Sequence, residues 1–462
     1  MTATSVTATN GSAAKTGETN PGASNLSTDA SLAPYLARLE GCSALRWQGR
    51  VTQVVGPLVE SEGPFCSVGE ICQIHDSQGR VLPGEIVGFR GSIVLSMPLD
   101  LPRGVRHGDR VVTWGEGPAL RVSEGMLGRV LDGSGQPLDS LGSYNAREYR
   151  ALDGAAPLPL ERLSIREPIG CGIRAVDAFL TCGRGQRVGI FGGSGVGKST
   201  LIGMMARNTG ADLTVLGLVG ERGREVRDFL ENSLGDEGRK RAVVVVSTSD
   251  QSPLLRIRAA LAATAAAEYF CARGKNVLLV VDSLTRLAMA QREIGLAAGE
   301  PPTAKGYTPS CFSLLARLIE RAGKFNSGSI TAFYTVLMEG DDEQDPLVDG
   351  ARALLDGHIM LDRKLAVRSH YPPIAVLDSV SRLMPAVCSA PHLQKAQELR
   401  RLLAAYTASE DLIRIGAYQK GSDPTLDKAL ALIPELHRFL MQKPGEAITL
   451  SDGIAKLLAL PS

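Results

Sequence analysis

The stretch VGIFGGSGVGKSTLIG, residues 188–203, has the residue types and the spacing of a phosphate-binding loop. Its core is the pattern Gly192-x-x-x-x-Gly197-Lys198-Ser199. Glycines let consecutive backbone N–H groups curl around phosphate oxygens, while the lysine adds a positive charge and the serine hydroxyl can ligate Mg²⁺. The loop follows an apolar, strand-like run and opens a helical one, which is the context that this motif needs. We therefore expect a nucleotide-phosphate site at this position.

Each part of this loop has its own predicted role. The backbone amides of residues 193–197 wrap the phosphates, Lys198 contacts the β- and γ-phosphates, and Ser199 holds Mg²⁺. The residues predicted to bind the nucleotide here are Gly192, Gly193, Ser194, Gly195, Val196, Gly197, Lys198, Ser199 and Thr200.

A second candidate ligand for the metal ends another apolar run, NVLLVVD, at Asp282. Ligands of open α/β sheets gather at the carboxyl ends of the strands, and an aspartate there can hold Mg²⁺ directly or through its water. Taken alone, an aspartate after an apolar run is more often a helix cap. The phosphate-binding loop upstream favours the metal role.

A third motif, LGLVGERGREV, decides between nucleotide binding and hydrolysis. Glu221 is expected at the carboxyl end of the strand that follows the phosphate-loop helix, where a carboxylate can polarise an attacking water. The adjacent Arg222 is counted with Glu221 and Lys198 among the predicted catalytic residues. The alternative is a surface ion pair of Glu221 with Arg222 or Arg224.

The composition and the hydrophobic pattern of the chain predict the elements that position these residues. Residues 1–44, rich in Thr, Ser, Ala and Gly, are expected to be disordered apart from a short amphipathic helix. Residues 45–118 contain short β-branched runs between Gly, Pro and Asp, typical of a small β-barrel or sandwich. Residues 119–385 alternate continuously apolar strands with helices, which predicts a doubly wound α/β core around a parallel sheet. Residues 386–462 have helical periodicity and are expected to form a helical domain.

Composition argues against several other classes of protein. A net charge of +1 over 462 residues gives no electrostatic reason to expect nucleic acid as a partner. No apolar run approaches the ~20 residues that span a bilayer, and the first residues do not form a secretory signal. The eight cysteines include no C-x-x-C pair and are expected to be free thiols in a reducing cytoplasm.

Six motifs occur in the order typical of ATPases related to the catalytic subunit of rotary ATP synthases: GGSGVGKST, GERGREV, VLLVVDSLTR, AQREIGLAAGEPPTAKGYTPS, DGHIMLDRKLA and LDSVSR. Within that group the chain resembles the flagellar and type III protein-export ATPases, through GEPPTAKGYTPSCFSLLARLIERAG and IGAYQKGSDPTLDKAL. The resemblance runs from about residue 45 to the C-terminus, and GSDPTLDKA leans towards the flagellar branch. It implies a RecA-like P-loop core with a small N-terminal β-barrel and a C-terminal helical domain.

The resemblance also implies roles for two further residues. Arg382, in DSVSR, matches the arginine that reaches across a subunit boundary to the neighbour's nucleotide. Tyr371 matches the aromatic residue that packs on the adenine base, although Pro373 and Ala375 depart from the family's usual pattern after it. The alternatives are an ordinary surface arginine and a tyrosine of the core.

The function implied by the resemblance is Mg²⁺-dependent ATP hydrolysis by a homohexameric ring that energises type III protein export for flagellum assembly. Implied partners are other copies of the chain, a regulatory stator-like protein at the N-terminus, export substrates and their chaperones, and the export gate. Such a protein is cytoplasmic and peripheral at the inner face of the membrane.

Three other functions share much of this chemistry. An injectisome secretion ATPase differs in the system that it serves, and a proton-coupled rotary synthase subunit shares all the active-site motifs. A hexameric RNA motor also carries a β domain before its P-loop core. However, the β region here lacks the clustered aromatic residues that bind single strands.

Overall fold

The computed structural model describes residues 45–461 with the exception of residues 339, 341 and 343. The segment predicted to be disordered, residues 1–44, lies outside the described residues. Within the described ranges, no helix is both long enough and apolar enough to cross a membrane.

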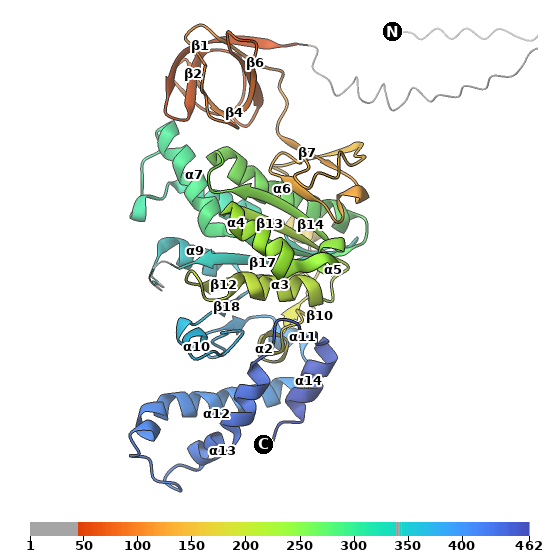
Figure 1. Ribbon diagram of the computed structural model, residues 1–462, viewed down its shortest axis with the longest axis vertical. Helices are drawn as coiled ribbons and strands as arrows, with labels where there is room; N and C mark the ends of the chain where they lie inside the picture. The colour runs from red at the N-terminus through yellow and green to blue at the C-terminus, as the bar shows by residue number, and fades with distance from the viewer. Residues whose placement is uncertain (1–44, 339, 341, 343, 462) are drawn as a thin grey trace, which may run out of the picture. The chain divides into compact units, whose positions relative to one another are not determined.

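Six short antiparallel strands form a closed barrel at the N-terminal end of the described chain (Figure 1). Apolar residues alternate along these strands, so that Cys72 and Ile74 of one strand and Leu82 and Ile86 of the next fill the barrel interior. In spatial order the strands are β1 (Trp47–Val55), β2 (Leu58–Glu62), β5 (Ile93–Pro98), β4 (Val81–Arg90), β3 (Ile71–His75) and β6 (Arg110–Thr113). The predicted barrel is confirmed.

A nine-stranded, mostly parallel sheet forms the centre of the chain. Only the short strands β19 and β16 pair antiparallel to their neighbours. In spatial order the strands are β19 (Val380–Ser381), β18 (Gly357–Met360), β12 (Arg187–Gly192), β17 (Ser329–Leu337), β15 (Asn276–Asp282), β13 (Leu213–Glu221), β14 (Ala242–Thr248) and β8 (Val130–Asp132), with β16 (Gly323–Lys324) beside β17.

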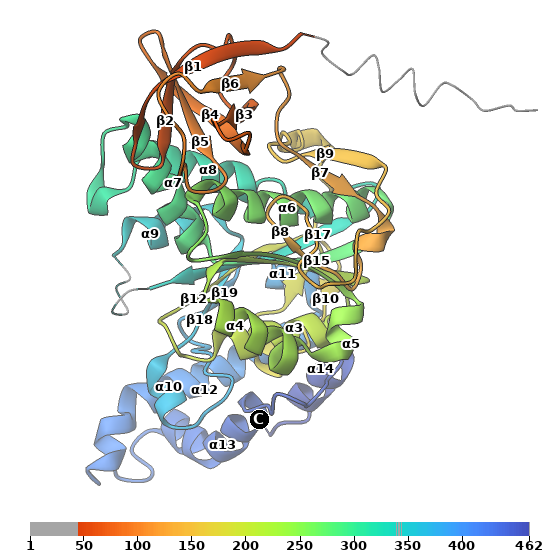
Figure 2. The same cartoon turned by 45° about the horizontal axis from the view of Figure 1, so that its top comes forward.

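The central strands are continuously apolar because both faces of the sheet are covered, as predicted. Alternate residues of one strand enter two different cores: Val243 and Val245 face one, and Val244 and Val246 face the other. Figure 2 shows the two layers of helices. One layer contains α6 (Pro253–Ala272), α7 (Leu284–Ala298) and α8 (Pro309–Ile319), and the other contains α3 (Lys198–Asn208), α4 (Gly223–Asp228), η3 (Phe229–Leu234) and α5 (Gly235–Lys240).

The last part of the chain is helical, as its periodicity predicts. Its helices are α12 (Ala390–Arg414), α13 (Pro424–Leu440) and α14 (Leu450–Leu458). They pack into the core that contains Val244 and Val246, the second core, through residues such as Leu399 and Leu436. His392 on α12 also bonds to the carbonyl of Ala178 in α2 (Arg174–Phe179), with Nε2 2.8 Å from the oxygen.

The remaining elements are short connections between these layers. They are β7 (Ala119–Val122) with β9 (Glu148–Ala151), β10 (Pro168–Ile169) with β11 (Cys182–Gly183), η1 (Glu124–Met126), η2 (Pro159–Glu161), η4 (Ala304–Gly306), α9 (Pro346–Leu354), α10 (Arg363–Val367) and α11 (Met384–Val387).

One strand of the central sheet arises from a segment whose sequence indicates only turns. β8 lies within GRVLDGSGQPLDSLG and pairs with β14 from Val130 to Asp132. Asp139 holds this segment by accepting hydrogen bonds from the Arg129 guanidinium, at 2.8 and 2.9 Å, and from the Val130 amide. These three residues therefore form a strand because they pair with β14, which is distant in the sequence, and not because of their own hydrophobic pattern.

Candidate active site

The predicted P-loop, glutamate and aspartate meet at one edge of the central sheet. They follow or end β12, β13 and β15, and Leu218 of β13 is in register with Asp282 at the end of β15. The carboxyl ends of parallel strands share an edge, and this is where ligands of such sheets bind. Tertiary structure thus brings together residues that lie far apart in the sequence.

The phosphate-binding loop turns sharply between β12 and α3. Gly195 and Gly197 have φ angles of 78° and 93°, a left-handed conformation that favours glycine. Lys198 is the first residue of α3, so the loop presents its backbone amides at a helix N-terminus, the end that favours anions. Val196 is anchored in the second core, while Ser199 is exposed. Ser194, Gly195 and Thr200 are exposed too.

Lys198 is buried among the charges of this edge. Its Nζ lies 3.5 Å from the carbonyl oxygen of Gly192. Burial lowers the pKa of the Lys198 amine, while the negative charges of Asp282 and Glu221 act to raise it. The arrangement leaves an ammonium group that an anionic phosphate would stabilise further.

Asp282 is a buried carboxylate with one oxygen already held. Its Oδ1 accepts a hydrogen bond of 2.5 Å from the Thr335 hydroxyl on β17. The peptide bond between Asp282 and Ser283 is cis.

The donor set at this edge fits Mg²⁺. Mg²⁺ prefers hard oxygen ligands and is usually held by one or two protein groups together with water and substrate phosphates. The Asp282 carboxylate and the exposed Ser199 hydroxyl meet this description. The described residues contain no cluster of three or more His, Cys, Asp or Glu side chains that would form a protein-only cage.

Glu221 ends β13 just after an irregularity in the strand. Gly220 has a φ of 69°, and the pairing of β13 with β14 shifts register there. A Cβ on Gly220 would lie 3.1 Å from Cδ of Arg286, so a side chain would crowd that arginine. The Glu221 carboxylate forms an ion pair with Arg286, with Oε1 3.2 Å from Nε. Burial, together with the charge of Asp282, raises the pKa of Glu221 to about 7.

Arg222 forms no direct ion pair with Glu221 among the described residues. Its side chain is 73% exposed and pairs with Glu225, three residues further along, at 3.3 Å. The partner of Glu221 is instead Arg286, and no ion pair of Glu221 with Arg222 or Arg224 forms among the described residues. The alternative interpretation of Glu221 as the partner of its sequence neighbours is therefore wrong.

Tyr371 lies beside the phosphate-binding loop. A Cβ on Gly197 would be 3.9 Å from Cε1 of this tyrosine, and the residue is 46% exposed. The backbone carbonyl of Tyr371 accepts a hydrogen bond of 2.9 Å from the amide of Gln442. The half-exposed ring therefore offers an open aromatic face next to the loop rather than filling the core.

Arg382 lies at the opposite end of the sheet from the phosphate-binding loop of its own chain. Its amide donates to the carbonyl of Asp356, whose own amide donates to the carbonyl of Arg187 at the start of β12. The loop follows Gly192 at the other end of this strand, about 17 Å away at ~3.3 Å per residue. The Arg382 side chain is exposed and has no hydrogen-bond or ion-pair partner within the described part of the chain.

Three residues of this edge were not predicted as site residues. Arg286 pairs with Glu221, Thr335 bonds to Asp282, and the Arg363 guanidinium donates to the carbonyl of Ser194 at 3.4 Å. Arg286 carries a local signal, because it follows Asp282 by four residues in the same motif. Arg363 lies in the quoted motif DGHIMLDRKLA, but nothing in that motif indicates that it reaches Ser194. Thr335 lies in none of the six motifs, and its proximity to Asp282 arises only from the order of the strands in the sheet.

Three family models match consecutive parts of the chain. Residues 51–115 match the beta-barrel domain of the ATP synthase alpha/beta family, and residues 172–381 match its nucleotide-binding domain. Residues 388–459 match the C-terminal domain of the T3SS EscN ATPase.

Curated relatives and a solved structure match nearly the whole chain. A flagellum-specific ATP synthase of Bacillus subtilis is 49% identical over 91% of this chain and 97% of the relative. A type 3 secretion system ATPase of Sinorhizobium fredii is 46% identical over 90% of this chain and 92% of the relative. The assembled ATPase EscN of enteropathogenic E. coli matches with a TM-score of 0.85 and 42% identity, covering 89% of this chain and 99% of that one. The chain therefore belongs to the ATP synthase alpha/beta family, in the branch of the flagellar and type III secretion ATPases.

Proposed function

We propose that this protein hydrolyses ATP as a homohexameric ring and thereby energises type III protein export for flagellum assembly. The observation that carries the ring is the position of Arg382. Each chain presents a P-loop at one end of its central sheet and an unpartnered arginine at the other. Two neighbouring copies would complete one site between them, which fits the names of the relatives, an ATP synthase and an ATPase, and the assembled EscN.

The chain's own groups would divide the chemistry of phosphoryl transfer. The loop amides and Lys198 bind the phosphates, and Glu221 orients the attacking water and accepts its proton. Ser199 and Asp282 would hold Mg²⁺, which neutralises phosphate charge when bound. Tyr371 packs on the adenine. Arg382 of the neighbour stabilises the charge that develops on the γ-phosphate. Arg222 receives no role in this scheme, because its side chain pairs with Glu225 and not with Glu221.

Partners beyond the ring are proposed from the same family membership. They are a stator-like regulator at the N-terminus, export substrates with their chaperones, and the export gate at the inner face of the cytoplasmic membrane. The relatives include a flagellum-specific ATP synthase and a type 3 secretion system ATPase at similar identities. We favour the flagellar system because the GSDPTLDKA segment leans that way.

The proposed function is tested with the purified full chain and with its gene. The rate of Mg²⁺-dependent ATP hydrolysis per chain is expected to rise with protein concentration in parallel with hexamer formation, followed by light scattering. Loss of the gene is expected to stop secretion of flagellar hook and filament proteins. A concentration-independent rate from a monomer would overturn the ring, and lost secretion of virulence effectors alone would favour the injectisome.

Hydrolysis is expected to rise with pH through about 7. Burial and the Asp282 charge raise the pKa of Glu221 to about 7, and only its deprotonated form can accept a proton from water. Since kcat/KM reports the free enzyme, it should fall about tenfold per pH unit below this value and level off above it.

The arginine beside Glu221 provides the control for this pH profile. The positive charge of Arg286 lowers the pKa of Glu221, so Arg286→Gln should move the midpoint to higher pH. A flat profile across the midpoint, or a midpoint that the substitution does not move, would contradict the assignment of Glu221 as the base.

A further inference from the structure

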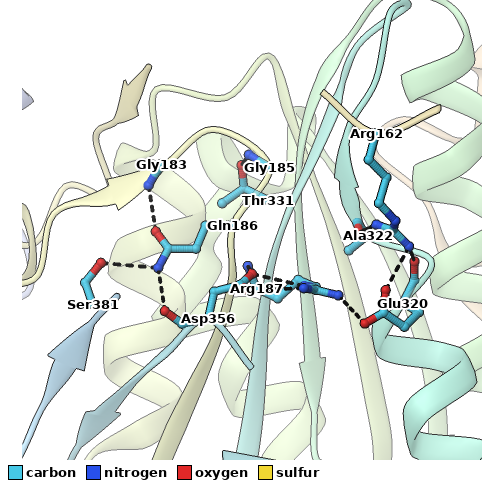
Figure 3. A network of polar contacts seen from close by, with 10 residues as sticks. All are labelled: Arg162, Gly183, Gly185, Gln186, Arg187, Glu320, Ala322, Thr331, Asp356 and Ser381. Atoms are coloured by element: carbon cyan, nitrogen blue, oxygen red, sulfur yellow. Dashed lines mark hydrogen bonds and ion pairs between the residues drawn. The ribbon is translucent and has the colours of Figure 1, made fainter. Parts of the chain in front are cut away.

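The backbone that carries Arg382 is tied to the central sheet by a buried polar network (Figure 3). Gln186 is fully buried, and its Nε2 donates to the carbonyl of Asp356 at 3.1 Å and to the hydroxyl of Ser381 at 3.2 Å. The same Asp356 carbonyl accepts the amide of Arg382 at 3.0 Å. One side-chain amide therefore contacts both the residue before Arg382 and the carbonyl that holds Arg382 itself.

The Gln186 side-chain carbonyl oxygen and the Ser381 hydroxyl hydrogen are also paired. The Gln186 Oε1 accepts the amide of Gly183 at 2.8 Å, which fixes the orientation of the side-chain amide. The hydroxyl of Ser381 donates to the carbonyl of Thr181 at 2.9 Å. Because every donor and acceptor is paired, the network has one arrangement, and a half-satisfied alternative would leave buried polar groups without partners.

A second set of contacts fixes Asp356 from the other side. Its carboxylate accepts three hydrogen bonds from Arg187, two from the guanidinium and one from the amide, at 3.0 to 3.1 Å. Arg187 in turn donates to Glu320 at 2.6 Å, and Glu320 also pairs with Arg162 at 2.9 Å. Figure 3 shows this chain of contacts running across the sheet from Ser381 to Arg162.

The Arg382 side chain itself has nothing comparable to hold it. It is exposed and unpartnered within the described residues. Arg382 directly follows β19, a strand of only two residues at the edge of the sheet. Its direction is therefore set by its backbone. A displacement of a catalytic group by 1 Å can cost on the order of 10²-fold in rate.

We propose that Gln186 is a positioning residue for catalysis in the neighbouring subunit, because with Asp356 and Ser381 it fixes the backbone from which Arg382 reaches the neighbour's γ-phosphate. This inference rests on the proposed function, in which Arg382 acts across the ring interface. Gln186 contacts no nucleotide, and its effect is expressed in a site to which its own chain contributes only the arginine.

The test uses mixed rings of two full-length protomers, each inactive alone. A site donor carries Arg382→Ala and keeps Glu221, while an arginine donor carries Glu221→Gln and keeps Arg382. Hydrolysis in the mixture arises only where an arginine donor sits beside a site donor. Gln186→Met, of similar size but without the amide, is then placed on one protomer or the other.

We expect Gln186→Met to lower the restored rate about 10- to 100-fold when the arginine donor carries it, and less than about twofold when the site donor does. Thr331→Val is the matched control. It removes a buried hydrogen bond to the Gly185 amide at the same end of the sheet, at 2.9 Å, without contacting β19. Its effect should be the same on either protomer.

Equal losses for Gln186→Met in both placements would overturn the inference and indicate a structural role. If that variant does not fold, Ser381→Ala is used in the same two placements, and Ser381→Thr, which keeps the hydroxyl, should retain the activity that the alanine loses. If the simple mixture restores no hydrolysis although mixed rings form, the trans role of Arg382 fails, and the positioning role fails with it.

Discussion

Replacing Glu221 with glutamine is expected to leave ATP binding intact and to lower the steady-state rate of hydrolysis by about 10²- to 10⁴-fold. Glutamine has the same shape and retains polar contacts at the end of β13, but its amide cannot accept a proton from the attacking water. In the proposed site the phosphates would be held by Lys198, which lies near the Gly192 carbonyl at the start of α3, and by the loop amides, all of which the substitution leaves in place. Calorimetric titration with ATP and a phosphate-release assay measure the two quantities separately.

Glu231→Gln is the matched control for this prediction. Glu231 is an exposed glutamate that pairs with Arg227 on the surface, at 2.8 Å. Its substitution should leave both the ATP affinity and the rate of hydrolysis at the wild-type level. Undiminished hydrolysis by the Glu221→Gln protein would remove Glu221 from the mechanism. A loss of ATP affinity equal to the loss of rate would assign it to binding instead.

Replacing Arg382 with alanine is expected to lower the rate of hydrolysis by about 10³- to 10⁵-fold in rings that still assemble. In the proposed ring, the charge that develops on the γ-phosphate would lose a guanidinium donor from the adjacent chain, whereas the other proposed contacts of the nucleotide would stay within one chain. Arg382→Lys should recover only part of the rate, because an ammonium group lacks the planar fork of guanidinium. Phosphate release at saturating ATP, with ring assembly followed by light scattering, provides the measurement.

The control for Arg382 is a second exposed arginine that the site does not use. Arg401 on α12 is exposed, and Arg401→Ala should turn over ATP like the wild type. An Arg382→Ala protein with wild-type activity per chain at every protein concentration would contradict the proposed trans role. A variant that no longer forms rings would place the arginine in assembly rather than in chemistry.

The residues that the sequence alone could mark are those encoded by short, contiguous patterns. The P-loop is a single run of residues, and its glycines, lysine and serine are read directly from it. Glu221 and Asp282 could be placed because each ends a continuously apolar run, and the carboxyl ends of parallel strands meet at one edge. The register of Leu218 with Asp282 confirms this convergence at the level of the fold.

What the sequence could not indicate depends on contacts between distant segments. Thr335 faces Asp282 because β17 lies next to β15, an order that no local pattern contains. Gln186 contacts Ser381 although the two residues are 195 positions apart in the sequence. The strands β8, β18 and β19 are two to four residues long, too short for periodicity to reveal, and their partners recruit them.

The lengths of the outer strands have a consequence for how copies of this chain can meet. The barrel closes on itself, and the central sheet ends on one side at a two-residue strand and on the other at a three-residue strand. Such short margins offer too few free main-chain N–H and C=O groups to extend a sheet from one molecule into the next. In the proposed ring, subunits would thus touch through side chains such as Arg382. Each subunit boundary could then loosen and tighten during a catalytic cycle without breaking the backbone hydrogen bonds of a shared sheet. The short outer strands would also protect the free subunit from edge-to-edge aggregation into fibres.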